Sequence, residues 1–156
     1  MPCVKSQLGD RYVQVDEQDY NDLHKAMKFT VSRWPAAKVT ILGATGRRED
    51  HTLGNISYLV TFAEEYPEIH IEMLTDYGRL CAMTRSRTFT SFPYQQVSIF
   101  TLTPDKPIDG YGLRWPLNSF HARRWWQASL NEALGTEFTL HTEGWLVVFQ
   151  TYEPKQ

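Results

Sequence analysis

The segment KVTILGATGRREDHTLGNISYLVTFAEEY, residues 38–66, decides the fold of the first half of the chain. Its beginning, 38–44, is a short β-branched run of the kind that forms a buried strand. Its later part, 51–66, places Leu53, Ile56, Leu59, Val60 and Ala63 on one face of a helix. The charged, glycine-containing stretch 43–55 therefore connects the carboxyl end of a strand to a helix start, which is where ligands bind in open α/β sheets.

The flanking sequence predicts an α/β part followed by an all-β part. Apolar residues between Leu23 and Val31 recur at helical spacing, and that pattern stops at Trp34–Pro35. After Pro67, seven short apolar runs predict a sandwich or roll, namely 68–76, 78–84, 87–93, 96–104, 111–117, 137–143 and 145–151. We expect a partial Rossmann-like parallel α/β domain over 1–67 and an antiparallel β-sandwich over 68–156.

The composition is that of a soluble globular protein. The 156 residues are 42% hydrophobic and 22% charged, with a formal net charge of -2. That charge disfavours nucleic acid as a partner, despite the short basic pairs Arg47–Arg48 and Arg123–Arg124. No apolar run approaches the roughly 20 residues that span a bilayer, so we expect a cytoplasmic protein without a membrane partner. Cys3 and Cys81 are too few for a disulfide framework or a zinc site.

Phosphate is the ligand that the stretch 43–48 suits best. Gly43 and Gly46 allow close approach of the backbone, and free N–H groups at the following helix start favour an anion. Arg47 and Arg48 add charge-assisted hydrogen bonds. The alternative is a solvated loop in which Asp50 caps the helix and the arginines face water. Residue types alone leave both interpretations open.

Four segments resemble thiamin pyrophosphokinase, and they occur in that family's order. GATGRREDHTLGNI (43–56) resembles the family segment that commonly reads GATGGRLDHTLANI, and DEQDYNDLHKAM (16–27) resembles its acidic segment. GLRWPL (112–117) resembles its Gly-Leu-Lys-Tyr-Pro-Leu strand, and 129–148 resembles its closing Ser-Asn-Glu segment and final hairpin. The resemblance implies a homodimer that transfers pyrophosphate from Mg-ATP to the hydroxyl of thiamin, giving thiamin diphosphate and AMP.

The resemblance also implies roles for individual residues on the nucleotide side. The catalytic residues that it implies are Asp22, Arg48 and Asp50, with Asp22 as a Mg²⁺ ligand. The nucleotide contacts that it implies are Gln18, Asp19, Gly46, Arg48, His51 and Asn55. Without the resemblance, Asp22 is equally a first-turn acid and Asp19 equally a helix N-cap. Arg47 stands where the family has glycine.

On the thiamin side, the resemblance implies contacts from Ser129 and Asn131, and Trp145 is a candidate to stack on the thiamin rings. Leu130 stands where the family usually has serine. Trp125 and Trp126 are expected in the sandwich core or in the dimer interface.

One family element has no counterpart in this sequence. Family members carry an earlier Gly-Asp-x-Asp-Ser element whose carboxylates complete the Mg²⁺ site, whereas Gly9-Asp10 is followed here by Arg11-Tyr12. The chain is therefore expected to correspond to the C-terminal two-thirds of a family member, with an incomplete metal site. Two interpretations stay open: a thiamin pyrophosphokinase of which this chain is an inactive fragment when alone, and a non-catalytic dimeric module that binds thiamin or phosphate.

Overall fold

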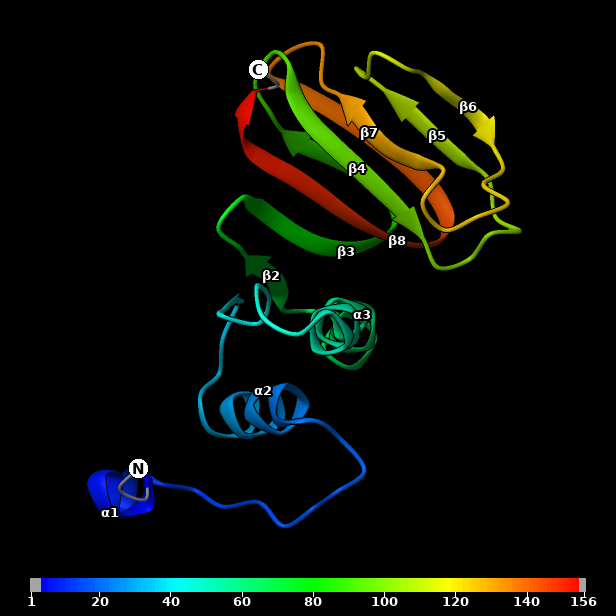
Figure 1. Ribbon diagram of the computed structural model, residues 1–156. Coiled ribbons are helices and arrows are strands. Elements are labelled where there is room, and N and C mark those ends of the chain that lie inside the picture. Colours follow the sequence, from blue (N-terminus) through cyan, green and yellow to red (C-terminus); the bar gives the residue numbers. More distant parts are fainter. Residues whose placement is uncertain (1–3, 155–156) are drawn as a thin grey trace. The chain divides into compact units, whose positions relative to one another are not determined.

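The computed structural model describes residues 4–154, which divide after Pro35 into two compact units. Figure 1 shows the helices and strands of both units. Among the helices of this described range, none is long and apolar enough to cross a membrane.

The first unit contains two helices and one 3-10 turn. They are α1 (Val4–Leu8), η1 (Gly9–Arg11) and α2 (Asp22–Arg33). The Asn21 side chain caps α2 by accepting a hydrogen bond of 3.0 Å from the backbone N–H of His24. The helix ends before Pro35, as predicted, but its N-cap is Asn21 and not Asp19.

The second unit begins with a strand–helix–strand motif. Strands β1 (Lys38–Leu42) and β2 (His70–Leu74) are parallel, with Lys38 opposite His70, and α3 (Glu49–Glu65) connects them. The residues of α3 that are fully buried, Leu59 and Phe62, lie in its second half, where the helix packs on β2, β3 and β8. Leu53, predicted on the apolar face of this helix, is 58% exposed and lies in the first half of α3, before these buried residues.

Two long strands organise the β-rich part. Strand β3 (Gly78–Thr90) pairs antiparallel with β8 (Glu137–Pro154), and their register shifts between Met83 and Arg85. Such a bulge bends a strand pair and divides it into two halves. The later half of β8 pairs with β4 (Gln95–Thr101), and β4 pairs in turn with β7 (Ala128–Glu132). The earlier half of β8 pairs with β5 (Ile108–Tyr111), and β5 pairs in turn with β6 (Leu117–Phe120).

The bent sheet encloses one apolar core. Its members come from both halves of the β3–β8 pair and from β4 to β7, and Phe89 stacks on Phe138 with ring centroids 4.9 Å apart. The core residues include Met83, Val97, Ile99, Ile108, Leu117, Leu140, Leu146 and Val148. Strand β2 joins this sheet through β3, so α3 and the loop before it are attached to the same framework.

The predicted order, an α/β part followed by a β-rich part, is confirmed in outline. The strand boundaries differ from the prediction. The runs 78–84 and 87–93 belong largely to one strand, β3, and 137–143 and 145–151 form β8, because the polar residues between them occupy a bulge and not a turn. Most of 111–117 is the connection from β5 to β6, and β7 was not predicted. The wider Rossmann-like arrangement stays a prediction.

A charged pair links β1 to β2 and makes stability depend on pH. Lys38 Nζ lies 2.7 Å from Glu72 Oε1, and hydrogen bonds from Lys38 and Thr40 lower the pKa of Glu72 from its ordinary value of 4.5. A carboxyl group with a lowered pKa stabilises the fold above its unfolded pKa, and this contribution is lost as the pH falls through its folded pKa. Lys38→Met is therefore expected to be less stable than the natural protein at pH 7. This difference in stability is expected to narrow as the pH falls below 4.5 and through the lowered folded pKa of Glu72.

Urea unfolding at a series of pH values checks this prediction. Lys28→Met removes a surface lysine for which no ion pair is seen within residues 4–154, and it serves as the control. A difference between Lys38→Met and the natural protein that stays constant with pH would contradict the role assigned to the pair.

Candidate functional site

At two positions, the loop between β1 and α3 has a backbone conformation that only glycine adopts readily. Gly43 has φ of 67° and Gly46 has φ of 88°, both in the left-handed region. The chain then enters α3 through Arg48, whose backbone is extended at φ -71° and ψ 134°. The first N–H groups of an α-helix lack carbonyl partners within the helix, so a helix start of this kind favours a bound anion.

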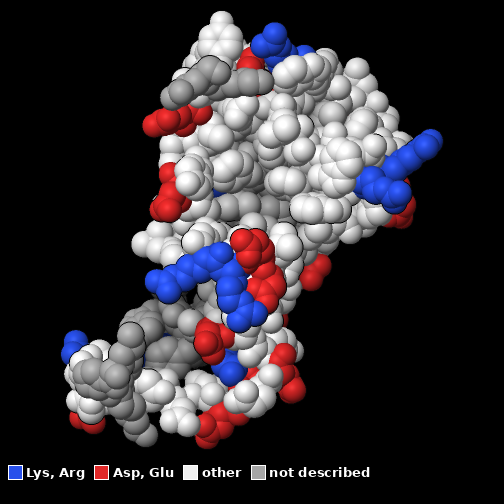
Figure 2. All heavy atoms as spheres, in the orientation of Figure 1, with Lys and Arg blue, Asp and Glu red and all other residues white. Residues whose placement is uncertain are grey.

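A pocket of about 540 Å³ lies at this loop. It is lined by Gly43, Ala44, Thr45, Arg47, Arg48, His51, Thr52 and Asn55. His51 and Asn55 are one turn apart on α3 and both line the pocket, and Asn55 Nδ2 donates a hydrogen bond of 2.8 Å to the carbonyl of Ala44. That bond ties the second turn of α3 to the loop. Figure 2 shows basic and acidic side chains gathered over this region.

Arg48 and Asp50 form a two-point ion pair beside the pocket. Arg48 Nε donates to Asp50 Oδ1 at 3.1 Å, and Arg48 Nη2 donates to Oδ2 at 2.6 Å. The hydrogen bond from Arg48, followed by one from the backbone N–H of His51, lowers the pKa of Asp50. Asp50 lies inside the helix and does not cap it, since the N-cap residue is Arg48. Its carboxylate instead holds the Arg48 guanidinium in one orientation.

The acidic segment lies in the first unit. Gln18 and Asp19 are exposed in the stretch before α2, and Asp22 is the exposed first residue of that helix. Mg²⁺ requires several oxygen ligands, and within residues 4–154 no group of three or more His, Cys, Asp or Glu side chains is arranged to hold a metal. The described residues do not make a complete Mg²⁺ site, and the role of Asp22 as a metal ligand stays a prediction.

Asn131 is buried, and its amide is occupied by the protein itself. Nδ2 donates to the carbonyl of Trp115 at 2.7 Å, while Oδ1 accepts from the backbone N–H groups of Trp115 at 3.2 Å and Glu132 at 2.8 Å. Asn131 thus fixes the position of the segment 112–117. Next to it, buried Glu132 pairs with Arg114 at 3.1 Å, and the Arg114 guanidinium lies over the Trp115 ring.

Asn131→Ala is expected to destabilise the fold by about 1 to 3 kcal/mol, because it leaves the Trp115 N–H and carbonyl without this partner. Thermal or denaturant unfolding measures the effect. Asn118→Ala, an exposed change on β6, is expected to stay within about 0.5 kcal/mol of the natural protein and serves as the control. Equal stability of the two variants would show that the Asn131 amide does not position this segment.

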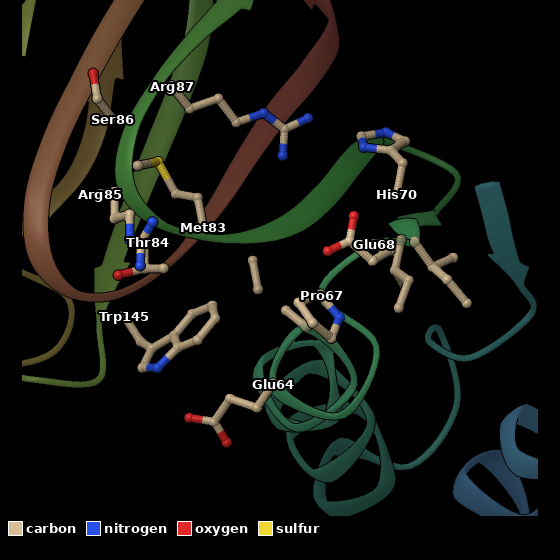
Figure 3. A pocket seen from close by; sticks show the side chains of 14 residues that line it. Glu64, Pro67, Glu68, His70, Met83, Thr84, Arg85, Ser86, Arg87 and Trp145 are labelled. Atoms are coloured by element: carbon tan, nitrogen blue, oxygen red, sulfur yellow. The ribbon is translucent and has the colours of Figure 1, made fainter. Parts of the chain in front are cut away.

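The three residues predicted for thiamin do not line one pocket. Ser129 and Asn131 are on β7, which β4 separates from β8 in the sheet. Trp145 lies on β8 and lines a pocket of about 870 Å³ between the end of α3, β2 and the bend of β3, shown in Figure 3. Trp125 and Trp126 are each about half exposed, so they do not fill the sandwich core, and their predicted alternative place in a dimer interface stays a prediction.

Two models of one protein family match the chain in succession. The model described as "Thiamin pyrophosphokinase, catalytic domain" matches residues 4–71, and "Thiamin pyrophosphokinase, substrate-binding domain" matches residues 78–149. The chain belongs to the thiamin pyrophosphokinase family. This confirms the resemblance found in the four sequence segments.

Individual proteins that are similar to this chain carry the name of the same family. "Thiamine pyrophosphokinase 1" of Oryza sativa subsp. japonica is 36% identical over 77 residues, which is 46% of this chain and only 28% of the rice protein. The crystal structure of thiamine pyrophosphokinase from Bacillus subtilis matches 95% of this chain and 70% of its own, with a TM-score of 0.79 at 22% identity. The enzyme from Geobacillus thermodenitrificans matches 96% and 69%, with a TM-score of 0.75 at 24% identity. At these identities the structures show a shared fold.

Some residues of this thiamin pyrophosphokinase family member were not singled out from its sequence. Arg114 and Trp115 belong to the cluster around Asn131 and Glu132, and their position depends on hydrogen bonds across 16 and 18 residues of chain. The GLRWPL motif marked the segment, but spacing alone does not indicate which β-strand it contacts. Of the two predicted cysteine thiols, Cys81 is free and buried, and Cys3 lies outside the described residues.

Proposed function

We propose that the chain takes part in the transfer of a pyrophosphoryl group from ATP to thiamin, giving thiamin diphosphate and AMP. Membership of the thiamin pyrophosphokinase family supports this proposal. The single observation that carries it is the loop pocket before α3, which combines two left-handed glycines, a helix start and an oriented arginine. These are the features that bind a phosphate chain.

In the proposed reaction, the hydroxyl oxygen of thiamin attacks the β-phosphorus of ATP. The bond between that phosphorus and the oxygen that bridges it to the α-phosphorus breaks, and this oxygen leaves as part of AMP. The hydroxyl proton is released. The β- and γ-phosphates then remain together on thiamin. The chemistry requires stabilisation of negative charge on the transferring group more than it requires covalent help from the protein.

Arg48 is proposed to supply that stabilisation. Its guanidinium binds phosphate oxygens at two points, and Asp50 fixes its direction through the two-point ion pair at 3.1 and 2.6 Å. Gly46, with no side chain, lets the phosphates approach the backbone, while His51 and Asn55 line the pocket on the helix side. By the family resemblance, Gln18, Asp19 and Asp22 stay proposed nucleotide contacts, with Asp22 as one carboxylate ligand of Mg²⁺.

Thiamin is proposed to bind to the β-rich part, which we assign to residues 68–156, with the nucleotide part over 1–67. Ser129 remains the candidate for a direct polar contact, and Trp145 for a stacking contact. The bonds that Asn131 makes to Trp115 favour a positioning role, in which the segment 112–117 is held in place for the ligand.

The functional unit is proposed to be a homodimer that forms through apolar side chains around β7. Leu130 is 70% exposed, and Trp115, Trp125, Trp126 and Leu134 nearby are at least half exposed. Figure 2 shows that the face over β4 and β7 carries few charged side chains, which is typical of an interaction surface. Sedimentation at several protein concentrations tests this assembly.

A non-catalytic dimeric module that binds thiamin or phosphate is the alternative function. The observation that favours it is that, within residues 4–154, no three or more His, Cys, Asp or Glu side chains are grouped so that they could hold a metal ion. Separate calorimetric titrations with thiamin, with Mg-ATP and with inorganic phosphate distinguish the two functions. Binding of both ligands supports the enzyme, binding of thiamin or of inorganic phosphate without Mg-ATP supports the module, and binding of none of them contradicts both.

A further inference from the structure

Two arginines of β3 and one histidine of β2 line a second polar pocket, of about 150 Å³, away from the loop before α3. Arg79, Arg87 and His70 line it together with Glu72, Cys81, Gln150 and the strand residues between them. The pocket lies where β3 curves beside β2, and none of its lining residues belongs to the pocket at the loop before α3.

The two guanidinium groups in this pocket have no carboxylate partner. Within residues 4–154, neither Arg79 nor Arg87 forms an ion pair with an Asp or Glu. Arg79 is held by hydrogen bonds to Gln150 Oε1 at 3.1 Å and to the Thr90 carbonyl at 3.0 Å, and Gln150 is itself buried. Arg87 has one weak contact, from Nη1 to Cys81 Sγ at 3.6 Å, and its guanidinium lies over the Phe89 ring.

The neighbouring acidic and thiol groups do not neutralise these arginines. Burial raises the pKa of the Cys81 thiol, which therefore stays protonated and uncharged. Glu72 forms no ion pair with either arginine: its Oε1 is bound by Lys38 at 2.7 Å and by Thr40 at 3.2 Å, and its Oε2 lies 3.8 Å from His70 Nε2. The two guanidinium groups together have ten N–H donors, and most of these remain available to bind an anion. Because both arginines are partly buried, an anion that binds there would satisfy polar groups that are only partly exposed to water.

His70 and Arg87 also line the larger pocket that contains Trp145, so the two pockets adjoin at these side chains. Figure 3 shows Arg87 and His70 directed towards one another across the upper part of the larger pocket, with Trp145 and Pro67 below. An acidic group held by Arg87 can therefore belong to a free ion or to a molecule whose ring extends towards the Trp145 indole.

We infer that Arg79, Arg87 and His70 bind a phosphate oxyanion in the pocket between β2 and β3, separately from the phosphate site proposed at residues 43–48. Two guanidinium groups supply two-point hydrogen bonds and a charge of +2, which match a phosphate dianion. His70 adds one ring nitrogen at the junction of the two pockets. This site uses none of the residues that line the loop pocket proposed for the phosphates of ATP, and it adjoins the pocket that contains Trp145.

Inorganic phosphate titrated into the whole chain, observed by NMR of the histidine rings, tests the inference. The His70 signals, assigned by comparison with His70→Gln, are expected to move with saturable dependence on phosphate. In Arg87→Gln the apparent dissociation constant for this movement is expected to rise at least about tenfold, because one of the two guanidinium groups is lost. Arg123→Gln removes an exposed arginine that lines neither pocket, and it is expected to leave the titration unchanged.

Arg79→Gln tests the same site if Arg87→Gln does not fold, and it is expected to weaken binding in the same way. His51 reports separately on the loop before α3, so failure of that site and failure of this one are distinguishable. His70 signals that ignore phosphate, or that respond equally in the natural protein and in the arginine variants, would overturn the inference. Tighter binding of AMP than of phosphate at His70 identifies a ring-bearing ester as the ligand, and equal binding identifies the free ion.

Discussion

Arg48→Ala is expected to lower the rate of AMP formation from thiamin and Mg-ATP by about 100- to 1,000-fold in a protein that shows this activity, equivalent to about 3 to 4 kcal/mol of transition-state stabilisation. The reason is that Arg48 is the one pocket residue whose guanidinium is oriented by a carboxylate, through contacts of 3.1 and 2.6 Å with Asp50. Removal of the guanidinium leaves charge on the transferring phosphates unbalanced. Chromatographic measurement of AMP checks the rate.

Two further variants separate the charge of Arg48 from its direction. Arg48→Lys keeps the charge and loses the two-point geometry, and Asp50→Asn keeps the guanidinium while weakening its orientation. Both are expected to fall between the natural protein and Arg48→Ala. Arg123→Ala is the matched control, since Arg123 is exposed and lies outside the pocket. An Arg48→Ala protein with unchanged turnover would remove Arg48 from the mechanism.

Phe138→Ala is expected to destabilise the protein by about 3 to 5 kcal/mol. Phe138 is almost fully buried in the core of the bent sheet, and its ring stacks on that of Phe89 at 4.9 Å. The substitution removes the ring from the buried core and from its contact with Phe89, and it leaves a cavity. Urea unfolding curves at neutral pH measure the loss.

Tyr77→Ala provides the comparison for Phe138, because Tyr77 is an aromatic residue in the turn between β2 and β3 and is 78% exposed. Its expected effect is within about 0.5 kcal/mol. A Phe138→Ala protein as stable as Tyr77→Ala would show that the core does not depend on the pairing of Phe89 with Phe138.

Local patterns in the sequence were sufficient to predict β1, α2 and α3. Each has the periodicity of its element over several residues, and each ends at a residue with a clear local role, such as Pro35 after α2 or Gly43 after β1. The pocket before α3 follows from the same local information, because Gly43, Gly46, Arg48, His51 and Asn55 all lie within 13 residues of chain.

Contacts across long stretches of chain could not be predicted in this way. The predicted strand runs are interrupted at Arg85–Ser86 and at Gly144, yet these residues belong to the continuous strands β3 and β8, at or beside the shift in their register. Strand β7 has a polar sequence whose buried members, Asn131 and Glu132, are satisfied by Trp115 and Arg114. Arg79, Arg87 and His70 show no motif, because they meet only after β2 and β3 pair.

Phosphorus NMR of the chain mixed with thiamin and Mg-ATP tests the proposed pyrophosphate transfer most directly. The proposal predicts that resonances of thiamin diphosphate and AMP appear in equal amounts, that they require thiamin, and that they diminish strongly in Arg48→Ala. Absence of thiamin diphosphate under conditions in which both substrates bind would contradict catalysis by this chain, and ADP in place of AMP would contradict transfer at the β-phosphorus.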